Sequence, residues 1–388
     1  MAARVTVGMP VYQGQDFVAE ALRSLQAQTF TDFELFISVD GDDQVSAEAC
    51  RPFLSDSRFR MVVHSERLDW VGNFNWLLEQ PLGEFFCYRQ HDDTTTPDFF
   101  AKLLDLADRR PDAAIVYADC QHIGEQSHIE EMPSVKGDTH ERLRQFIELY
   151  RPTPCRGIIR REAIAQAGPV RVDEFRSNQQ IFVWLTKLLR WGSFLRFPEP
   201  VYIRRIHEDN YHKQNRRWSD EKKLGDWTTV FTGLLEAVVP TCTTVEERLF
   251  FQTFILDRVC IARGRQSYWI KPDTIEKSGT FILRCFERLA AEGSIDRWIA
   301  PYPSGASDVL PTMLTDAMAA QSDKHRLVMQ QAEIERERLD QELAQLKSRN
   351  RAKTRRNRKL AGEIDLLRNS KALRFERAMR RLFGQSVS

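Results

Sequence analysis

The sequence has no long hydrophobic run. Among its 388 residues, no apolar stretch approaches the roughly 20 residues that a helix needs to cross a bilayer. The N-terminus also lacks the basic-then-apolar pattern of a secretory signal, because the apolar run 5–11 is short and is interrupted by Gly8 and Pro10. We therefore expect a cytoplasmic protein whose contact with the cytoplasmic membrane face, if any, is peripheral.

Closely spaced cysteines are missing as well. The seven cysteines are scattered along the chain, and no two of them have the spacing of a zinc ribbon. The pattern argues against a disulfide framework and fits a reducing compartment.

Neither sign of charge dominates the chain. The formal net charge is +1, with 29% charged and 42% hydrophobic residues, which is an ordinary balance for a soluble globular protein. The length allows two or three domains and a large core.

The first half of the chain alternates between apolar strands and amphipathic helices. Continuous apolar runs predict strands at 4–11, 33–39, 59–64, 85–88 and 113–118, with helical patterns between them. Strands of this kind are buried on both faces, so we expect an α/β fold with a mostly parallel sheet flanked by helices.

Acidic residues follow several of these strands. Asp40 comes after the second strand, Asp92 and Asp93 after the fourth, and Asp119 after the fifth. Since the carboxyl ends of parallel strands form one edge, these acids are expected in one polar crevice. Two adjacent carboxylates repel each other unless a cation or a proton relieves them. The pair therefore indicates a metal-phosphate site, and an Asp-rich turn is the alternative.

Several motifs together resemble the family 2 glycosyltransferases of the GT-A fold, and particularly the type that makes spore-coat polysaccharide. The resemblance covers about the first half of the chain. The segments that carry it are 5–13, 24–30, 33–37, Asn75, 83–84 and the triplet 91–93.

The resemblance implies a site for a nucleoside diphosphate sugar, with UDP-sugar favoured. Asp40 matches the acid that accepts a hydrogen bond from the base, whereas Val39 replaces a second acid that the family often has. A divalent metal, Mn²⁺ or Mg²⁺, is expected on Asp93 and His207; a structural role for this histidine is the alternative. The residues that the resemblance assigns to nucleotide binding are Pro10, Tyr12, Asp40, Asn75 and Asp92.

The catalytic base is where the sequence departs from the family. The family has an Asp, often preceded by Glu, where Gln179 and Gln180 stand. A glutamine cannot accept the proton of an acceptor hydroxyl at neutral pH. Three interpretations follow. Asp173 or Glu174 serves as the base instead, or the mechanism needs no carboxylate at this position, or the domain binds the sugar nucleotide without turnover. Nearby, Arg156 either meets a phosphate or sugar or is a solvated surface charge, the commoner case.

The C-terminal half has a different organisation. After a glycosyltransferase domain at 1–215, we expect a helical extension at 216–320, in which Thr244 and Glu247 form a capping box. A coiled coil with a basic stretch at 321–370 predicts a homo-oligomer. The basic amphipathic tail at 371–388 suits an anionic membrane surface. Nucleic acid is the rival partner for this charge, but the basic run lacks stacking aromatics, so we expect none.

The sequence therefore predicts a metal-dependent glycosyltransferase that acts in surface polysaccharide or glycoconjugate synthesis. It would move a sugar to a hydroxyl of a saccharide or lipid-linked acceptor. The alternative is a catalytically impaired sugar-nucleotide-binding protein or a coiled-coil scaffold.

Overall fold

The computed structural model describes residues 3–125, 127–175, 177–207, 218–255 and 258, all within a compact unit that extends from Met1 to Trp298. The predicted coiled coil and basic tail lie outside the described residues, as does much of the helical extension. The predicted boundary at 215/216 also falls on undescribed residues, so the division into domains stays a prediction. In the described part of the chain, no helix is both long and apolar enough to span a membrane.

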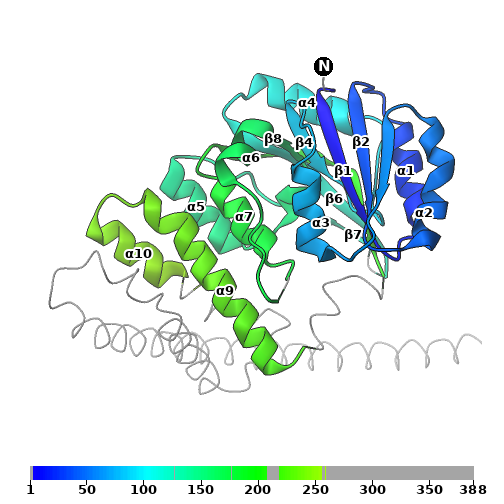
Figure 1. Cartoon of the computed structure of the whole chain (residues 1–388). Helices are drawn as coiled ribbons and strands as arrows, with labels where there is room; N and C mark the ends of the chain where they lie inside the picture. Colours follow the sequence, from blue (N-terminus) through cyan, green and yellow to red (C-terminus); the bar gives the residue numbers. More distant parts are fainter. Residues whose placement is uncertain (1–2, 126, 176, 208–217, 256–257, 259–388) are drawn as a thin grey trace, which may run out of the picture. The chain divides into compact units, whose positions relative to one another are not determined.

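A nine-stranded mixed sheet forms the centre of the described part (Figure 1). The strand order is β3-β2-β1-β4-β8-β6-β9-β5, and β7 pairs with β6. The strands are β1 (Val5–Val11), β2 (Phe33–Val39), β3 (Phe59–Val63), β4 (Phe85–Tyr88), β5 (Thr94–Thr95), β6 (Ala113–Gly124), β7 (His128–Glu130), β8 (Ile158–Arg160) and β9 (Ser193–Ile206).

Four of the eight strand pairs in this sheet are parallel, and six of its nine strands run in one direction. Strands β1 to β4 share one direction, and β6 pairs parallel with β9. Strand β8 runs antiparallel to both β4 and β6, so β6 and β9 point the same way as β1 to β4. The expected α/β architecture with a mostly parallel sheet is confirmed, and the carboxyl ends of these strands form one edge.

Helices cover both faces of the sheet. Val5, Val7 and Met9 of β1 share a core cluster with residues of α1, α2 and α4, whereas a side chain at Gly8 would meet Leu77 of α3 on the other face. The described helices are α1 (Val18–Gln26), α2 (Gln44–Cys50), η1 (Arg51–Ser55), α3 (Asp69–Leu78), α4 (Phe99–Arg109), α5 (Thr139–Leu149), η2 (Thr153–Arg156), α6 (Arg161–Ala167), α7 (Gln180–Leu188), α9 (Asp220–Val238), η4 (Val239–Thr241) and α10 (Val245–Ile255).

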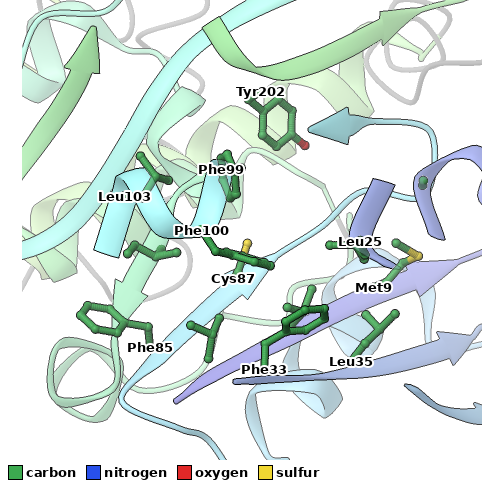
Figure 2. Packing of buried hydrophobic residues seen from close by; sticks show 14 of the residues in the cluster. Met9, Leu25, Phe33, Leu35, Phe85, Cys87, Phe99, Phe100, Leu103 and Tyr202 are labelled. Atoms are coloured by element: carbon green, nitrogen blue, oxygen red, sulfur yellow. The ribbon is translucent and has the colours of Figure 1, made fainter. Parts of the chain in front are cut away.

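Aromatic rings join the two halves of the sheet. Phe100 of α4 lies 5.3 Å from Phe33 of β2 and 5.3 Å from Phe99, ring centre to ring centre. Phe99 in turn lies 6.1 Å from Tyr202 of β9 (Figure 2). This packing brings the end of β9 beside the acids that follow β4.

The start of the helical extension packs on α7. Gly233 of α9 permits a close approach, because a Cβ atom there would lie only 2.8 Å from a methyl group of Val183. The predicted capping box opens α10: Glu247 N–H donates to Thr244 Oγ1 at 3.1 Å, and Thr244 N–H donates to Glu247 Oε2 at 3.2 Å. The close approach at Gly233 packs α9 against α7, the helix at whose start Gln179 and Gln180 stand.

Candidate active site

The acids after β2 and β4 do lie at one edge of the sheet. Asp40 follows β2 directly, and Asp92 and Asp93 follow β4, which runs parallel to β2. Asp119 does not join them, contrary to expectation, because β6 continues past it. Its buried carboxylate accepts two hydrogen bonds from Arg196, at 2.6 and 2.7 Å, and so has a structural role.

Asp40 lies next to a backbone N–H and a guanidinium group that both donate to it. This carboxylate is 3% exposed and accepts hydrogen bonds from Leu68 N–H at 2.6 Å and from Arg67 Nε at 3.0 Å. The Arg67 guanidinium also stacks on Tyr12, with 3.4 Å between its carbon and the ring centre. The edge thus holds a buried carboxylate next to a planar cation and an aromatic ring, groups that suit a nucleotide base.

Sequence reasoning missed Arg67. It lies between β3 and α3, among other charged residues, and resembles a solvated loop residue. Gly41, with φ of 73°, makes its position available, because a Cβ atom at 41 would lie 2.8 Å from the Arg67 side chain. The predicted base-pocket residue Pro10 lies at the end of β1, where its carbonyl contacts His91 Nδ1 at 3.2 Å.

Asp93 is fully engaged by the protein. Its buried carboxylate accepts hydrogen bonds from Tyr202 OH at 2.7 Å and from Arg205 N–H at 3.0 Å, and Arg156 Nε lies 3.6 Å away. Burial and the neighbouring charge of Asp92 raise the pKa of this carboxyl. Asp93 therefore holds the end of β9 in place, and its predicted role of metal ligand stays a prediction.

Asp92 pairs with His207 instead. His207 Nε2 and Asp92 Oδ2 are 3.0 Å apart, and the two side chains are 21% and 15% exposed. Burial alone would raise the pKa of Asp92, but the hydrogen bond with His207 and the charge of His91 outweigh it and hold this pKa below its ordinary value. His207, the other predicted metal residue, thus pairs with Asp92, and the metal-ligand role of His207, like that of Asp93, stays a prediction.

This pair fits a cation whose shell is completed by the substrate. Within the described ranges, no group of three or more His, Cys, Asp and Glu side chains could hold a metal ion. Mg²⁺-type sites commonly use one or two carboxylates and fill the remaining positions with phosphate oxygens and water. Asp92 and His207 would supply two protein ligands to such a cation.

The two glutamines stand at the start of α7: Gln179 is the N-cap residue and Gln180 is the first residue of the helix. Gln180 is buried and donates from Nε2 to Asp173 Oδ2 at 2.7 Å and to Thr229 Oγ1 at 3.1 Å. Gln179 is half-buried, and its N–H donates to Ser177 Oγ at 3.1 Å. Of the predicted bases, Asp173 therefore contacts the family's base position, whereas Glu174 is exposed.

A second carboxyl lies in the same cluster. Asp226 of α9 is 1% exposed, and burial, with the nearby charge of Asp173, raises its pKa to about 7, although a hydrogen bond with Ser177 opposes the change. The sequence does not single out this residue, because there it is only one acid beside the apolar stripe of α9. Asp226 places a group that titrates near neutrality next to Asp173.

Arg156 and Asn75, two further residues singled out in the sequence, both contact other parts of the protein. Arg156 is not a solvated surface charge: it is 8% exposed and donates from Nη2 to Gln90 Oε1 at 3.0 Å. Asn75 uses its whole amide to hold Val170, donating to its carbonyl and accepting from its N–H, both at 2.8 Å. A role of Asn75 in nucleotide binding stays an untested prediction.

Comparison with known sequences finds similarity to glycosyltransferases. Residues 6–168 match the family described as Glycosyl transferase family 2. The putative glycosyltransferase EpsH of Bacillus subtilis is 29% identical over 112 residues, 29% of this chain and 32% of EpsH. The amylovoran biosynthesis glycosyltransferase AmsB of Erwinia amylovora is 22% identical over 231 residues, 56% of this chain and 72% of AmsB. An uncharacterized protein of Sinorhizobium fredii, y4gI, is 27% identical over 118 residues, which span only 13% of its length.

Comparison with solved structures supports the fold. The crystal structure of S. aureus TarS 1–349 superposes with a TM-score of 0.56 at 14% identity, over 74% of this chain and 82% of TarS 1–349. The same protein in complex with UDP-GlcNAc superposes with a TM-score of 0.55 at 13% identity, over 77% of this chain and 82% of that one. The fold is of the GT-A type, and the sequence of residues 6–168 is similar to glycosyl transferase family 2.

Proposed function

We propose that this protein transfers a sugar from a nucleoside diphosphate sugar to an acceptor hydroxyl. The observation that carries the proposal is the joint placement of Asp40, Arg67 and Tyr12 beside the Asp92–His207 pair at the carboxyl edge of a family 2 domain. Surface polysaccharide or glycoconjugate synthesis is the setting that the family and the relative AmsB favour. The finer likeness to the spore-coat type stays a prediction.

The base of the donor would lie on the Tyr12 side of this edge. Asp40 would accept the N3–H of uracil, and Arg67 would stack with the base and Tyr12. A bound UDP-GlcNAc in a protein of the same fold makes a UDP-sugar the first donor to test.

Asp92 and His207 would hold a divalent cation against the diphosphate. When bound, this Mn²⁺ or Mg²⁺ would stabilise the negative charge that develops on the leaving nucleoside diphosphate. Asp93 would keep His207 in place, because it anchors the preceding residues of β9 through Tyr202 and Arg205.

Asp173 is the proposed base. The acceptor hydroxyl would attack the anomeric carbon, the bond to the diphosphate would break, and the hydroxyl proton would pass to the Asp173 carboxylate. Its contact with Gln180, at the family's base position, supports this assignment. The same glutamine also supports the second candidate function, a protein that binds sugar nucleotides without turning them over.

Calorimetric titration of UDP, with and without Mn²⁺, tests the donor site. We expect metal-dependent binding that Asp40→Asn weakens about tenfold, because the buried acceptor for the base is replaced. Asp42→Asn is the matched control, since it removes an exposed carboxylate two residues away. Equal UDP affinity in all three proteins would contradict the proposal. UDP binding without release of UDP from any UDP-sugar would favour the second candidate.

A further inference from the structure

Two arginines at the carboxyl edge have no place in the donor site described above. Arg156 is buried at the end of η2, and Arg204 lies half-buried on β9. In the described part of the chain, the Arg204 guanidinium makes no hydrogen bond or ion pair. Arg156 Nε has no hydrogen-bond partner, and its ion pair with Asp93 Oδ2 spans 3.6 Å. Each thus keeps donor capacity at a place where a buried cation needs an anion.

The nearby carboxylates are already engaged. Asp93 accepts from Tyr202 and Arg205, as described above. Glu130 of β7 contacts His122 Nε2 at 2.9 Å through one oxygen and accepts from Thr153 Oγ1 at 2.9 Å through the other. These two acids therefore do not neutralise both guanidinium groups at close range.

The two arginines also repel each other. Burial and then the Arg156 charge lower the pKa of Arg204, and only afterwards do Asp93 and Glu130 oppose this effect. A like pair of this kind is relieved by an anion that both groups can contact.

Both arginines lie away from the proposed pocket for the nucleotide base. Arg204 is paired in register with His122 near the carboxyl end of β6, away from β1 and β2, where Tyr12 and Asp40 lie. Arg156 joins this place to the proposed cation pair, because it donates to Gln90, two residues before Asp92. An anion here would lie next to the reacting centre, on the side opposite to the proposed pocket for the nucleotide base.

We propose that Arg156 and Arg204 form a subsite for an anionic group of the acceptor, a phosphate or a carboxylate carried by a saccharide. This inference rests on the proposed glycosyl transfer and names the class of its acceptor. Guanidinium groups bind phosphate and carboxylate through paired N–H donors, so two of them would select charged over neutral saccharides. The donor diphosphate is the other source of the same chemistry.

Ligand-observed NMR titration separates these outcomes. The probes are glucose 6-phosphate, glucuronate and glucose, and UDP with Mn²⁺ is titrated calorimetrically on the same proteins. We expect wild type to bind at least one charged sugar about tenfold or more tightly than glucose. In Arg204→Gln this preference falls to about threefold or less, with UDP affinity unchanged; Arg204→Lys restores part of it.

The control variant is Arg110→Gln, which removes an equal charge next to the amino-terminal end of β6, where Arg110 pairs with Asp112. No preference for charged sugars in wild type, or a preference that Arg204→Gln leaves intact, overturns the inference. A loss of UDP affinity in Arg204→Gln assigns the arginine to the donor diphosphate and overturns it too. Charged-sugar preference in a wild-type protein that fails to bind UDP overturns the acceptor assignment and the proposed function together.

Discussion

The side-chain amide of Gln180 donates a 2.7 Å hydrogen bond to the carboxylate of Asp173. The family places its catalytic carboxylate at the glutamine position, so here a carboxylate stands one contact away from it. Thr229 of α9 donates to the same Asp173 oxygen at 3.0 Å, and Phe175 N–H donates to the other oxygen at 3.0 Å. The Asp173 carboxylate is thus held by α7, α9 and its own loop.

If Asp173 is the base, Asp173→Asn lowers turnover by about 100-fold or more, because the amide cannot take the hydroxyl proton. UDP affinity should change less than about twofold, since no donor contact is proposed for this residue. Release of UDP from a UDP-sugar measures the first effect, and calorimetry measures the second. Glu174→Gln, which neutralises the exposed neighbour, is the control. A fully active Asp173→Asn would leave the mechanism without this base.

Asp226 should make stability depend on pH. Its pKa is about 7 in the folded protein, against an ordinary value of 3.8, so the unfolded chain ionises first as pH rises. The free energy of unfolding therefore falls between about pH 4 and pH 7, by about 4 kcal/mol at most. Asp173 and Lys222 are the charged groups that contribute to this pKa.

Asp226→Asn removes that ionisation. We expect urea unfolding to show a variant more stable than wild type at pH 8 and similar to it at pH 4. Glu236→Gln changes an exposed acid of the same helix, which pairs with Arg171 at 3.4 Å, and serves as the control. A stability difference that is constant from pH 4 to pH 8 would show that Asp226 does not titrate in this range.

Arg67, which no sequence motif marks, should contribute to the affinity for the nucleotide of the donor. Arg67→Lys keeps the charge but loses the planar group that stacks on Tyr12 and the Nε–H that reaches Asp40. We expect UDP to bind about tenfold more weakly, with little change in thermal stability. Arg60→Lys, on an exposed arginine of β3, is the matched control. If both variants bind UDP like wild type, the guanidinium does not contact the base.

The sequence was sufficient for the order of the long elements from β1 to β6, because continuous apolar strands and amphipathic helices leave a strong periodic signal. Strands β5 and β7 were missed because two or three residues carry no period. The end of β6 was placed too early, since Asp119 resembles the end of a strand until Arg196, 77 residues away, pairs with it.

The placement of Asp40 and Asp92 at one edge of the sheet was predictable from the strand pattern, whereas the surroundings of residues that depend on tertiary contacts were not. Arg156 resembles a surface charge in sequence, but it is buried and donates to Gln90, 66 positions away. Asp226 belongs to a helix in which the pattern shows only core residues. Burial of a charge depends on which elements meet, and local sequence does not record that.

The adjacent acids after β4 should separate into a binding and a structural residue. Asp92→Ala should keep its fold and lose the Mn²⁺ dependence of UDP binding, because it removes one ligand from the proposed cation pair. Asp93→Ala should instead lose stability, since Tyr202 OH and the Arg205 N–H are left without their acceptor. Each buried donor without a partner costs about 1–3 kcal/mol.

Urea unfolding and calorimetric UDP titration on the two variants distinguish these effects, and Tyr202→Phe is the companion variant for Asp93. Removing only the Tyr202 hydroxyl should cost about 1 kcal/mol or somewhat more, because Asp93 keeps the Arg205 N–H but loses one donor. It should leave the Mn²⁺ dependence in place, since Tyr202 touches neither Asp92 nor the proposed cation. If Asp93→Ala unfolds like wild type and loses metal-dependent binding, Asp93 is the ligand, and the hydrogen bonds that now occupy it must open when the cation binds.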